Sequence, residues 1–203
     1  MPFRFRKFRS SYVDPCAAEL PVAPWKQGGC ELSQTALLVI DVQPGNIGTC
    51  YQPDAVVGVI AGLLEKARGA GVPVIYVQDD DVGPEGSVEW QIDARVAPRA
   101  GEPVVRKKAC DAFYGTNLHE ILQEKGVGRL VVTGARTEYC IDSACRRATT
   151  LGYNVVLVSD GHTTGDTKVL PAAQVIAHAN RIFNGFDNLE NWAEVHPSQE
   201  ITF

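Results

Sequence analysis

Short apolar runs alternate with amphipathic stretches along most of this chain. Continuous apolar runs are typical of strands that are covered on both faces of a parallel sheet. We therefore predict five buried strands, at residues 35–41, 74–77, 103–108, 130–132 and 154–160. The remainder after residue 183 is expected to hold a short strand or to pack at an edge.

Stretches with helical spacing separate these strands. Apolar residues recur at this spacing from Val57 to Ala67, in a helix that begins at Pro53 and ends by Gly69. Further helices are predicted over residues 117–125, from about Thr137 onward, and over 172–183. Alternating strands and helices indicate an α/β fold of three α/β/α layers, Rossmann-like, with a mostly parallel sheet of five or six strands.

Residues 1–33 follow neither pattern. Basic residues alternate with phenylalanine at the start, and prolines and glycines interrupt the rest. We interpret residues 1–33 as an N-terminal extension or arm and residues 34–203 as one domain, which is large enough to bury a substantial core. A transit peptide is a remote alternative, and the segment lacks the apolar region of a secretory signal.

Composition narrows the class of partner. Hydrophobic residues make up 45% and charged residues 21% of the chain, and its net charge is -5. This charge gives no general attraction for nucleic acid or an anionic membrane. No apolar run approaches the roughly 18 residues that span a bilayer. We expect a small-molecule partner, with no nucleic acid and no membrane.

The cysteines do not form a metal or disulfide pattern. They stand at positions 16, 30, 50, 110, 140 and 145, with no C-x-x-C pair and no tight cluster with histidine. We expect reduced thiols, a cytoplasmic location and no metal or cofactor. The triplet Asp79-Asp80-Asp81 opens a long loop that runs to about Pro103. A solvated turn is favoured there over a hard-cation site.

Three reactive side chains follow predicted strands: Asp41, a lysine at 107 or 108, and Cys140. Ligands gather at the carboxyl ends of parallel strands, so these groups should meet in one crevice. Cys140 would lie in the first turn of a helix capped by Thr137, where the helix dipole lowers the thiol pKa. Acyl transfer needs this set: the thiol attacks a carbonyl, the carboxylate moves protons and the lysine stabilises charge. The plainer alternatives are a turn aspartate and a small buried cysteine.

Aromatic and histidine residues supply further candidates. Trp90 would stack on a substrate or plug the rim of the site, and His162, directly after a strand, is a candidate for lining the pocket. His119 and His196 are assigned to a helix surface and to the tail. Four bulky residues beside loops and a helix end predict a homodimer or higher homo-oligomer. They are Trp90, Tyr114, Phe183 and Phe186.

Four segments together resemble the isochorismatase-like cysteine hydrolase superfamily over residues 34–183. They are Leu37–Gln43, Val105–Leu118, Val131–Cys140 and Gly152–Asp160. The resemblance implies an isochorismatase-like fold and, from its spacing to Phe113, selects Lys107 over Lys108. It also implies a cis peptide at Ala135–Arg136, with the N–H groups of Arg136 and Cys140 forming an oxyanion hole. Within it we assign five residues to substrate binding: Gln43, Trp90, Phe113, Tyr139 and His162.

Departures from the family pattern restrict the kind of bond that the protein is expected to cleave. Nothing after Val77 supplies the Asp-x-His metal motif of nicotinamidases, so the resemblance implies neither metal nor nicotinamide. Isochorismatases proper cleave a vinyl ether without a nucleophilic cysteine, so Cys140 favours an amide, lactam or carbamoyl C–N bond. The chain looks most like the metal-free amidase branch, which includes streptothricin hydrolase. The alternatives are an idle binding or scaffold member of the same fold and a vinyl-ether hydrolase.

Overall fold

The computed structural model describes residues 34–203. The predicted arm over residues 1–33, with Cys16 and Cys30, lies outside the described residues. The strands are β1 (Gln34–Ile40), β2 (Val74–Asp79), β3 (Val104–Lys107), β4 (Val127–Ala135), β5 (Asn154–Thr163), β6 (Phe186–Asn188) and β7 (Asn191–His196). The helices are α1 (Pro44–Ile47), α2 (Pro53–Gly69), α3 (Leu118–Glu124), α4 (Asp142–Thr150) and α5 (Ala172–Phe183), with a short 3-10 helix η1 (Ala94–Val96) and a π-helical turn η2 (Thr137–Ile141).

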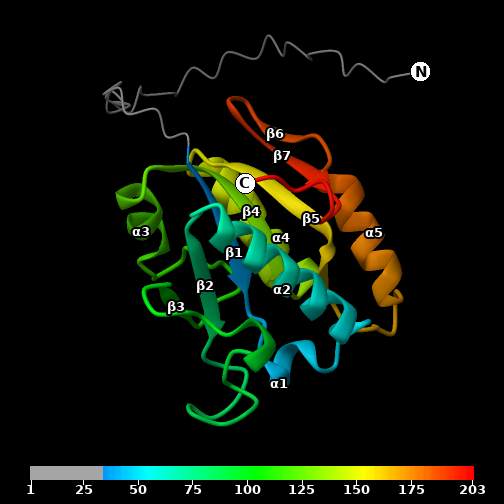
Figure 1. Cartoon of the computed structure of the whole chain (residues 1–203). Helices are drawn as coiled ribbons and strands as arrows, with labels where there is room; N and C mark the ends of the chain where they lie inside the picture. Colours follow the sequence, from blue (N-terminus) through cyan, green and yellow to red (C-terminus); the bar gives the residue numbers. More distant parts are fainter. Residues whose placement is uncertain (1–33) are drawn as a thin grey trace, which may run out of the picture. The chain divides into compact units, whose positions relative to one another are not determined.

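The strands form one sheet in the order β3-β2-β1-β4-β5-β7-β6 (Figure 1). Neighbouring strands are parallel except for β6 and β7, which pair antiparallel at one edge. The predicted α/β class with a mostly parallel sheet is confirmed. The predicted count of five or six strands is wrong, because the three-residue β6 contains Asp187 and Asn188 and has no apolar run to mark it.

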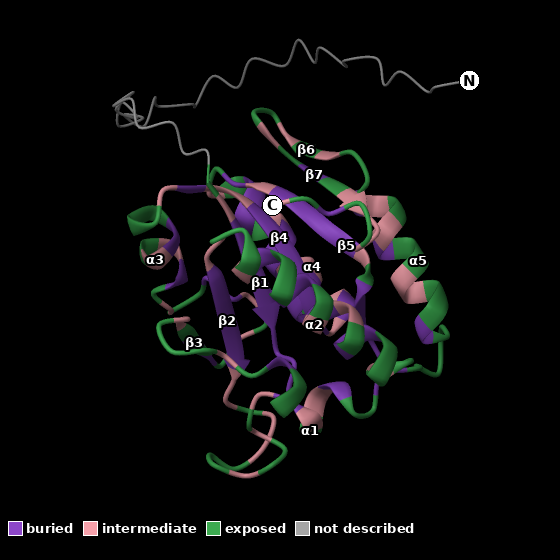
Figure 2. Ribbon diagram, in the orientation of Figure 1, coloured by how far each residue is buried: buried purple, intermediate pink, exposed green. Residues whose placement is uncertain are grey.

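Strand β1 lies inside the sheet between β2 and β4, and its side chains alternate between two cores. Ala36, Leu38 and Ile40 pack in the first core, and Leu37 and Val39 pack in the second. Figure 2 shows burial along this part of the sheet. Burial on both faces explains why β1 is a continuous apolar run rather than an alternating one.

Helices cover both faces of the sheet. Helix α2 buries Ile60 and Leu64 in the second core, whereas α3 and α4 bury Leu122 and Ala148 in the first. Figure 1 shows α2 crossing in front of the strands. Each fully buried leucine or isoleucine contributes about 2 kcal/mol of hydrophobic stabilisation. The arrangement is the predicted three-layer α/β/α fold.

The carboxyl ends of the parallel strands meet at one edge of the sheet. Across the ladders Ile40 pairs with both Val77 and Gly134, and Asp79 pairs with Lys107. Residues at the ends of β1, β2 and β3 are therefore brought together by register, together with the turn that follows β4.

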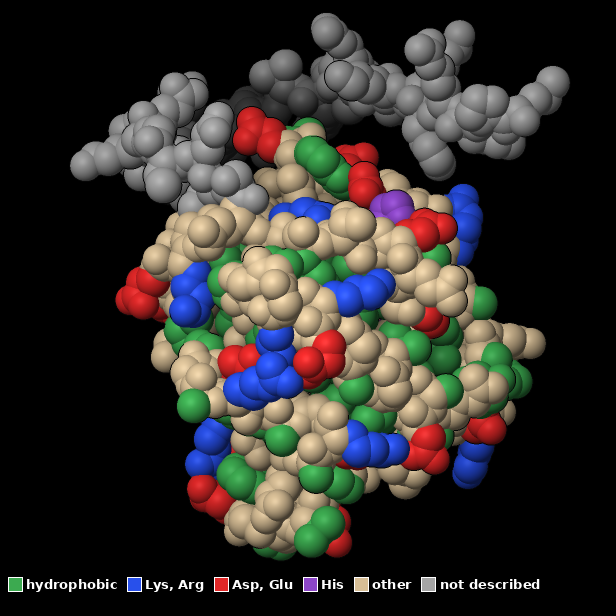
Figure 3. Space-filling view, in the orientation of Figure 1, with side chains coloured by type: hydrophobic (Ala, Val, Ile, Leu, Met, Phe, Trp, Pro, Cys, Tyr) green, Lys and Arg blue, Asp and Glu red, His purple; other side chains and the backbone are tan. Residues whose placement is uncertain are grey.

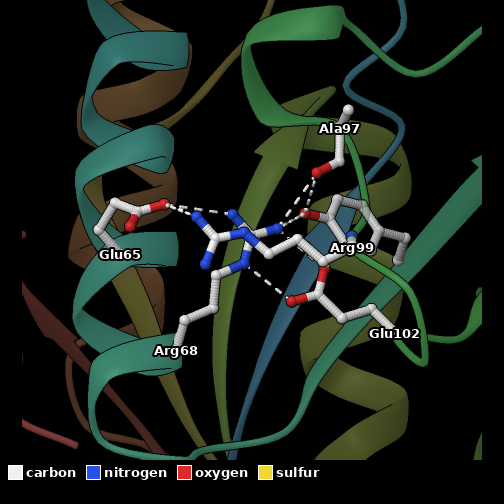
Figure 4. Close-up of polar contacts among 6 residues, drawn as sticks. Glu65, Arg68, Ala97, Arg99 and Glu102 are labelled. Atoms are coloured by element: carbon white, nitrogen blue, oxygen red, sulfur yellow. Dashed lines mark hydrogen bonds and ion pairs between the residues drawn. The ribbon is translucent and has the colours of Figure 1, made fainter.

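On the face covered by α2, a group of polar residues joins this helix to the β2–β3 connection (Figure 4). Arg68 Nε and Nη2 donate to the two carboxylate oxygens of Glu102, each at 2.8 Å. Nη2 also donates to the Tyr76 hydroxyl and the Ala97 carbonyl, each at 3.1 Å. We call the group the Arg68 cluster; it consists of Glu65, Arg68, Tyr76, Ala97, Arg99 and Glu102.

Charged side chains of both signs lie on the surface of the described residues. On the face seen in Figure 3, Lys and Arg side chains are interspersed with Asp and Glu side chains. No helix among residues 34–203 is long and apolar enough to cross a bilayer.

The bulky residues behind the homo-oligomer prediction differ in exposure. Tyr114 is 74% exposed, but Phe183 is fully buried and packs edge-on against Phe186, with ring centroids 5.8 Å apart. Phe183 thus gives no support to the homo-oligomer, which remains a prediction.

Candidate active site

Asp41 follows the last residue of β1 and is fully buried. Its φ of 53° lies in the left-handed region, which non-glycine residues seldom adopt. Lys107 Nζ lies 2.8 Å from Asp41 Oδ2. However, neither carboxylate oxygen accepts a well-directed hydrogen bond within the described part of the chain. The contact is therefore an ion pair, and the buried carboxylate keeps unused capacity to accept a proton.

The environment makes Asp41 an unusual acid. Burial raises the pKa of Asp41 to about 6, against the opposing positive charge of Lys107. A carboxyl group with this pKa is ionised at neutral pH yet can take up a proton at small energetic cost. Asp41 is thus suited to act first as a base and then as an acid.

Lys107 is the last residue of β3, along which exposed and buried residues alternate from Val104. Its side chain is fully buried, and Nζ lies 3.4 Å from Cys140 Sγ. Burial lowers the pKa of Lys107, but the adjacent Asp41 carboxylate raises it and the net shift is upward, so the ammonium stays charged. Lys108 is exposed. The structure brings Lys107, and not Lys108, to Asp41 and Cys140.

Cys140 lies in η2, the turn between β4 and α4, and is 7% exposed. The N-cap of this turn is Arg136 and not Thr137, which is its first residue. Burial raises the pKa of the Cys140 thiol, and the charge of Asp41 raises it further, although Lys107 acts in the opposite direction. The predicted lowering of this pKa is wrong for the resting site. The proton stays on sulfur until a base removes it.

Asp79 joins the same site, although its place in a run of three aspartates did not mark it as a candidate. It ends β2, its Oδ2 lies 2.7 Å from Lys107 Nζ, and its side chain is 19% exposed. Its neighbour Asp80 pairs with Arg106 at 2.7 Å, so the acidic triplet is not the solvated turn we predicted. The available signal was position, because a carboxylate at the end of a buried parallel strand points to a site just as Asp41 does. We call the group of Asp41, Asp79, Lys107 and Cys140 the Lys107 cluster.

The Lys107 cluster includes potential metal ligands. Asp41, Asp79 and Cys140 each offer a ligand atom within 4.8 Å of the others. The Lys107 ammonium lies 2.8, 2.7 and 3.4 Å from these three side chains and supplies the positive charge that a metal ion would bring. A divalent ion would be repelled by this buried cation. These residues fit a resident ammonium better than a metal, and the metal-free site remains our prediction.

The backbone before Cys140 has a special conformation. The peptide bond Ala135–Arg136 is cis, as the resemblance implied. Gly134 has φ 124°, and a Cβ there would overlap the backbone carbonyl of Ile40, so only glycine fits. Strand β4 continues through this glycine to Ala135 rather than breaking at it. The oxyanion hole formed by the N–H groups of Arg136 and Cys140 stays a prediction.

The Arg136 side chain connects η2, the turn that carries Cys140, to residues 46–49, which follow β1 in the chain. Its Nε donates to Asn46 Oδ1 at 2.9 Å and its Nη2 donates to Thr49 Oγ1 at 2.7 Å. The side-chain amide of Asn46 in turn donates to the Asp41 carbonyl at 3.1 Å. One chain of hydrogen bonds therefore links the turn that carries Cys140 to the backbone of Asp41.

All five predicted substrate-binding residues stay predictions, and two of them lie near Cys140. Tyr139 precedes the nucleophile and is 53% exposed, so its ring is free to contact a ligand. Phe113 packs in the same core cluster as Cys140, with 8% exposure and its ring stacked on Tyr153 at a centroid distance of 6.1 Å. Phe113 can form the apolar wall of a pocket.

Gln43 makes its hydrogen bonds within the protein. Its Nε2 donates to the carbonyls of Asp79 and Trp90, at 2.9 and 2.6 Å, and its Oε1 accepts from the Asp79 N–H at 2.9 Å. The side chain is fully buried, and both amide hydrogens are used. Gln43 therefore positions the end of β2, and these contacts give no support to its assignment to substrate binding, which stays a prediction.

His162 is also committed to the protein. It is 1% exposed, with Nδ1 2.9 Å from the Thr137 hydroxyl and Nε2 2.9 Å from Asn180 Oδ1. Burial lowers its pKa, so the ring is neutral at pH 7. Both ring nitrogens brace the turn that carries Cys140 against α5, which gives no support to the pocket role of His162; that role stays a prediction.

Trp90 lies on the other face of the sheet from Cys140. Its ring centre is 5.0 Å from the guanidinium carbon of Arg106, and the ring borders a hollow together with Gln78 and Val104. Arg106 and Lys107 are adjacent in β3, so their side chains point to opposite faces. This position gives no support to stacking of Trp90 on a substrate at Cys140, and the choice between stacking and plugging the rim of the site stays a prediction.

Comparisons with known proteins agree with the geometry. A sequence model described as the isochorismatase domain matches residues 35–184. A streptothricin hydrolase from Streptomyces noursei is 39% identical over 145 residues, 67% of this chain and 52% of that protein. An N-carbamoylsarcosine amidase from Arthrobacter sp is 30% identical over 146 residues, 61% of this chain and 54% of that protein. The match therefore spans about half the length of these relatives. The crystal structure of an isochorismatase from Pseudomonas putida KT2440 aligns with a TM-score of 0.73 at 31% identity, covering 85% of this chain and 92% of that one.

Proposed function

Because the chain belongs to the isochorismatase family of hydrolases, we propose that it is a cysteine-dependent amidohydrolase. The substrate is a small amide, lactam or carbamoyl compound, and the bond cleaved is the C–N bond. Cys140 is the nucleophile, Asp41 is the general acid and base, and Lys107 stabilises charge.

One observation carries this proposal. The Lys107 ammonium lies 2.8 Å from the Asp41 carboxylate and 3.4 Å from the Cys140 sulfur, and all three side chains are buried. Burying an ion pair beside a thiol adds little to the stability of the folded protein, since desolvation of the charges offsets most of the attraction between them. An arrangement of this kind is expected where a base and a nucleophile must work together.

Acylation begins with the proton on sulfur. Asp41 accepts the Cys140 proton as the sulfur attacks the substrate carbonyl carbon, and the carbonyl oxygen becomes an oxyanion. The N–H groups of Arg136 and Cys140 would bind that oxyanion. Collapse re-forms the carbonyl and breaks the C–N bond, while Asp41 returns its proton to the leaving nitrogen. The products are a free amine and a thioester on Cys140.

Deacylation reverses the roles. Asp41, ionised again, takes a proton from a water molecule as the water oxygen attacks the thioester carbonyl. Collapse of this second tetrahedral intermediate breaks the C–S bond, and the proton on Asp41 returns to sulfur. The carboxylic or carbamic acid leaves. Lys107 keeps its proton throughout and offsets negative charge as it passes between Asp41 and sulfur.

The relatives favour this reaction over the alternatives. Two of the similar proteins are named for hydrolysis of streptothricin and of N-carbamoylsarcosine. A vinyl-ether hydrolase has no use for a nucleophilic thiol beside a base, and an idle scaffold has no use for the buried Asp41–Lys107 pair. Both alternatives predict that removing the sulfur leaves the activity, or its absence, unchanged.

Cys140→Ala tests the proposal. We expect this variant to lose amide hydrolysis by roughly 10⁴-fold or more, because no nucleophile remains, while its thermal unfolding stays close to that of the parent. Cys110→Ala is the control, since Cys110 is exposed. Retention of turnover by Cys140→Ala would contradict the proposal.

A further inference from the structure

Asp79 gives the Lys107 cluster a second carboxylate that the reaction steps do not use. Its Oδ2 is 2.7 Å from Lys107 Nζ, about as close as Asp41 is at 2.8 Å. Its Oδ1 accepts the N–H of Asp81 at 2.9 Å. The carboxylate is thus held by a backbone donor on one side and by the ammonium on the other. Its orientation is defined by the fold.

The charged members of the cluster differ in exposure. The side chains of Asp41 and Lys107 are 0% exposed, whereas that of Asp79 is 19% exposed. Asp79 is therefore the charged side chain of the Lys107 cluster that reaches solvent. The solvent-accessible charge of the cluster is negative.

The charge balance points the same way. When Asp41 is ionised and the Cys140 thiol is neutral, two carboxylates share one ammonium and the cluster carries one net negative charge. Arg106 does not compensate it, because that side chain points to the opposite face and pairs with Asp80 and Glu85, each at 2.7 Å. Where the local dielectric constant is low, as beside buried charges, one uncompensated charge changes local ligand concentration by about tenfold or more.

We propose that Asp79 is a specificity-determining residue that makes the site favour amides bearing a positive charge near the scissile bond and disfavour anionic amides. The statement about substrates rests on the proposed amidohydrolase function. The charge preference of the site does not, so it can be measured without turnover. A purely structural Asp79 would hold Lys107 in place and leave that preference unchanged.

The test compares two matched reagents that attack thiols. Methanethiosulfonates carrying a trimethylammonium or a sulfonate group react with the same thiolate, so the ratio of their rates at Cys140 cancels the thiolate fraction. The rates are followed by peptide mass spectrometry at low ionic strength, where charge effects are least screened. Each is divided by the rate with a small neutral thiol in solution. Labelling of the exposed Cys110 shows that both reagents are active.

We expect a corrected cation-to-anion ratio of about ten or more at Cys140 in the parent protein. Asp79→Asn keeps the shape of the side chain and should lower this ratio at least about fivefold. Asp81→Asn is the matched control, since it removes an exposed carboxylate from the same loop, and its ratio should stay within about twofold of the parent.

Three results would overturn the proposal: a parent ratio near one, an unchanged ratio in Asp79→Asn, or an equal fall in Asp81→Asn. Because the raised pKa of Cys140 slows its reaction, incubation is prolonged; failure of both reagents to modify Cys140 at any time, while Cys110 is labelled, would also overturn the proposal, since a site closed to both cannot select on charge. The parent ratio needs no variant, so poor folding of Asp79→Asn leaves the test intact. Absence of amide turnover with the ratio as expected would instead count against the amidohydrolase function.

Discussion

Strand β2 contributes to two clusters of charge, one on each face of the sheet. Tyr76 belongs to the Arg68 cluster and Asp79 belongs to the Lys107 cluster. In the first, Arg68 donates to Glu102 with both arms of its guanidinium and to neighbouring oxygens at 3.1 Å. In the second, the buried Asp41 oxygens accept no well-directed hydrogen bond from the described residues.

The comparison distinguishes an ion pair that stabilises the fold, in the Arg68 cluster, from one that we propose takes part in catalysis, in the Lys107 cluster. Hydrogen bonding from Arg68 lowers the pKa of Glu102, whereas burial raises the pKa of Asp41 to about 6. A paired carboxylate like Glu102 cannot act as a base near neutral pH. Asp41 is ion-paired too, with Lys107, but burial raises its pKa to about 6, so its carboxylate can accept a proton near neutral pH, and it lies in the same cluster as the Cys140 thiol.

Among the charged side chains of the two clusters, the largest expected effect on activity is at Lys107. Lys107→Ala leaves Asp41 and Cys140 without their cation, and we expect turnover to fall roughly a hundredfold or more, equivalent to about 2.7 kcal/mol. The adjacent Lys108→Ala should stay within about threefold of the parent, since the Lys108 side chain is exposed. Steady-state kinetics of both variants on one amide substrate provide the measurement. Loss in Lys108→Ala with none in Lys107→Ala would mean that the geometry around β3 is wrong.

An effect on stability alone is expected at the Arg68 cluster. Arg68→Ala leaves the nearly buried Glu102 without its bidentate partner and should lower the free energy of unfolding by about 2 kcal/mol. This corresponds to a fall in Tm of about 4–8 °C for a domain of this size, with kcat/KM unchanged. Arg99→Ala is the control, because its side chain is 58% exposed and its ion pair is worth about 0–1 kcal/mol. Calorimetry gives the stability and steady-state kinetics give kcat/KM. A large loss of kcat/KM in Arg68→Ala would contradict the claim that this cluster acts on stability alone.

The smallest change expected near neutral pH is in the pH dependence of kcat/KM of the parent protein. Asp41 must be ionised to accept the thiol proton, so kcat/KM should rise with pH, level off above a pKa of about 6, and fall about tenfold per unit below it. Burial raises the pKa of Cys140, and a mechanism that began from free thiolate would therefore keep accelerating through pH 8 and 9. A profile from pH 5 to 9 distinguishes the two, and continued acceleration would remove Asp41 from its role as base.

Positions at the ends of buried strands were predictable, since parallel strands such as β1 and β5 are continuous apolar runs. Asp41 and Cys140 followed from that placement. The choice between Lys107 and Lys108 required the family resemblance, because alternation alone leaves both open. The two-sided burial that marks β1 is absent from β6, and that hairpin was missed.

Polar side chains were harder to assign. Gln43 was assigned to the substrate within the family resemblance and His162 because it follows a strand, but their hydrogen-bond partners come from residues as distant as Trp90 and Asn180. Nothing local in the sequence reveals such partners. The position of Trp90 likewise depends on the face to which a long loop returns. Asp79 was overlooked because three consecutive aspartates resemble a surface turn.

The thioester on Cys140 is the central claim, and rapid-quench mass spectrometry of the protein during turnover tests it most directly. With an amide substrate at saturating concentration, quenched into acid, we expect a mass increase equal to the acyl group, mapped to the peptide that contains Cys140 and absent from Cys140→Ala. Turnover of the same substrate with no acyl mass on Cys140, or with the acyl group on another residue, would contradict the account.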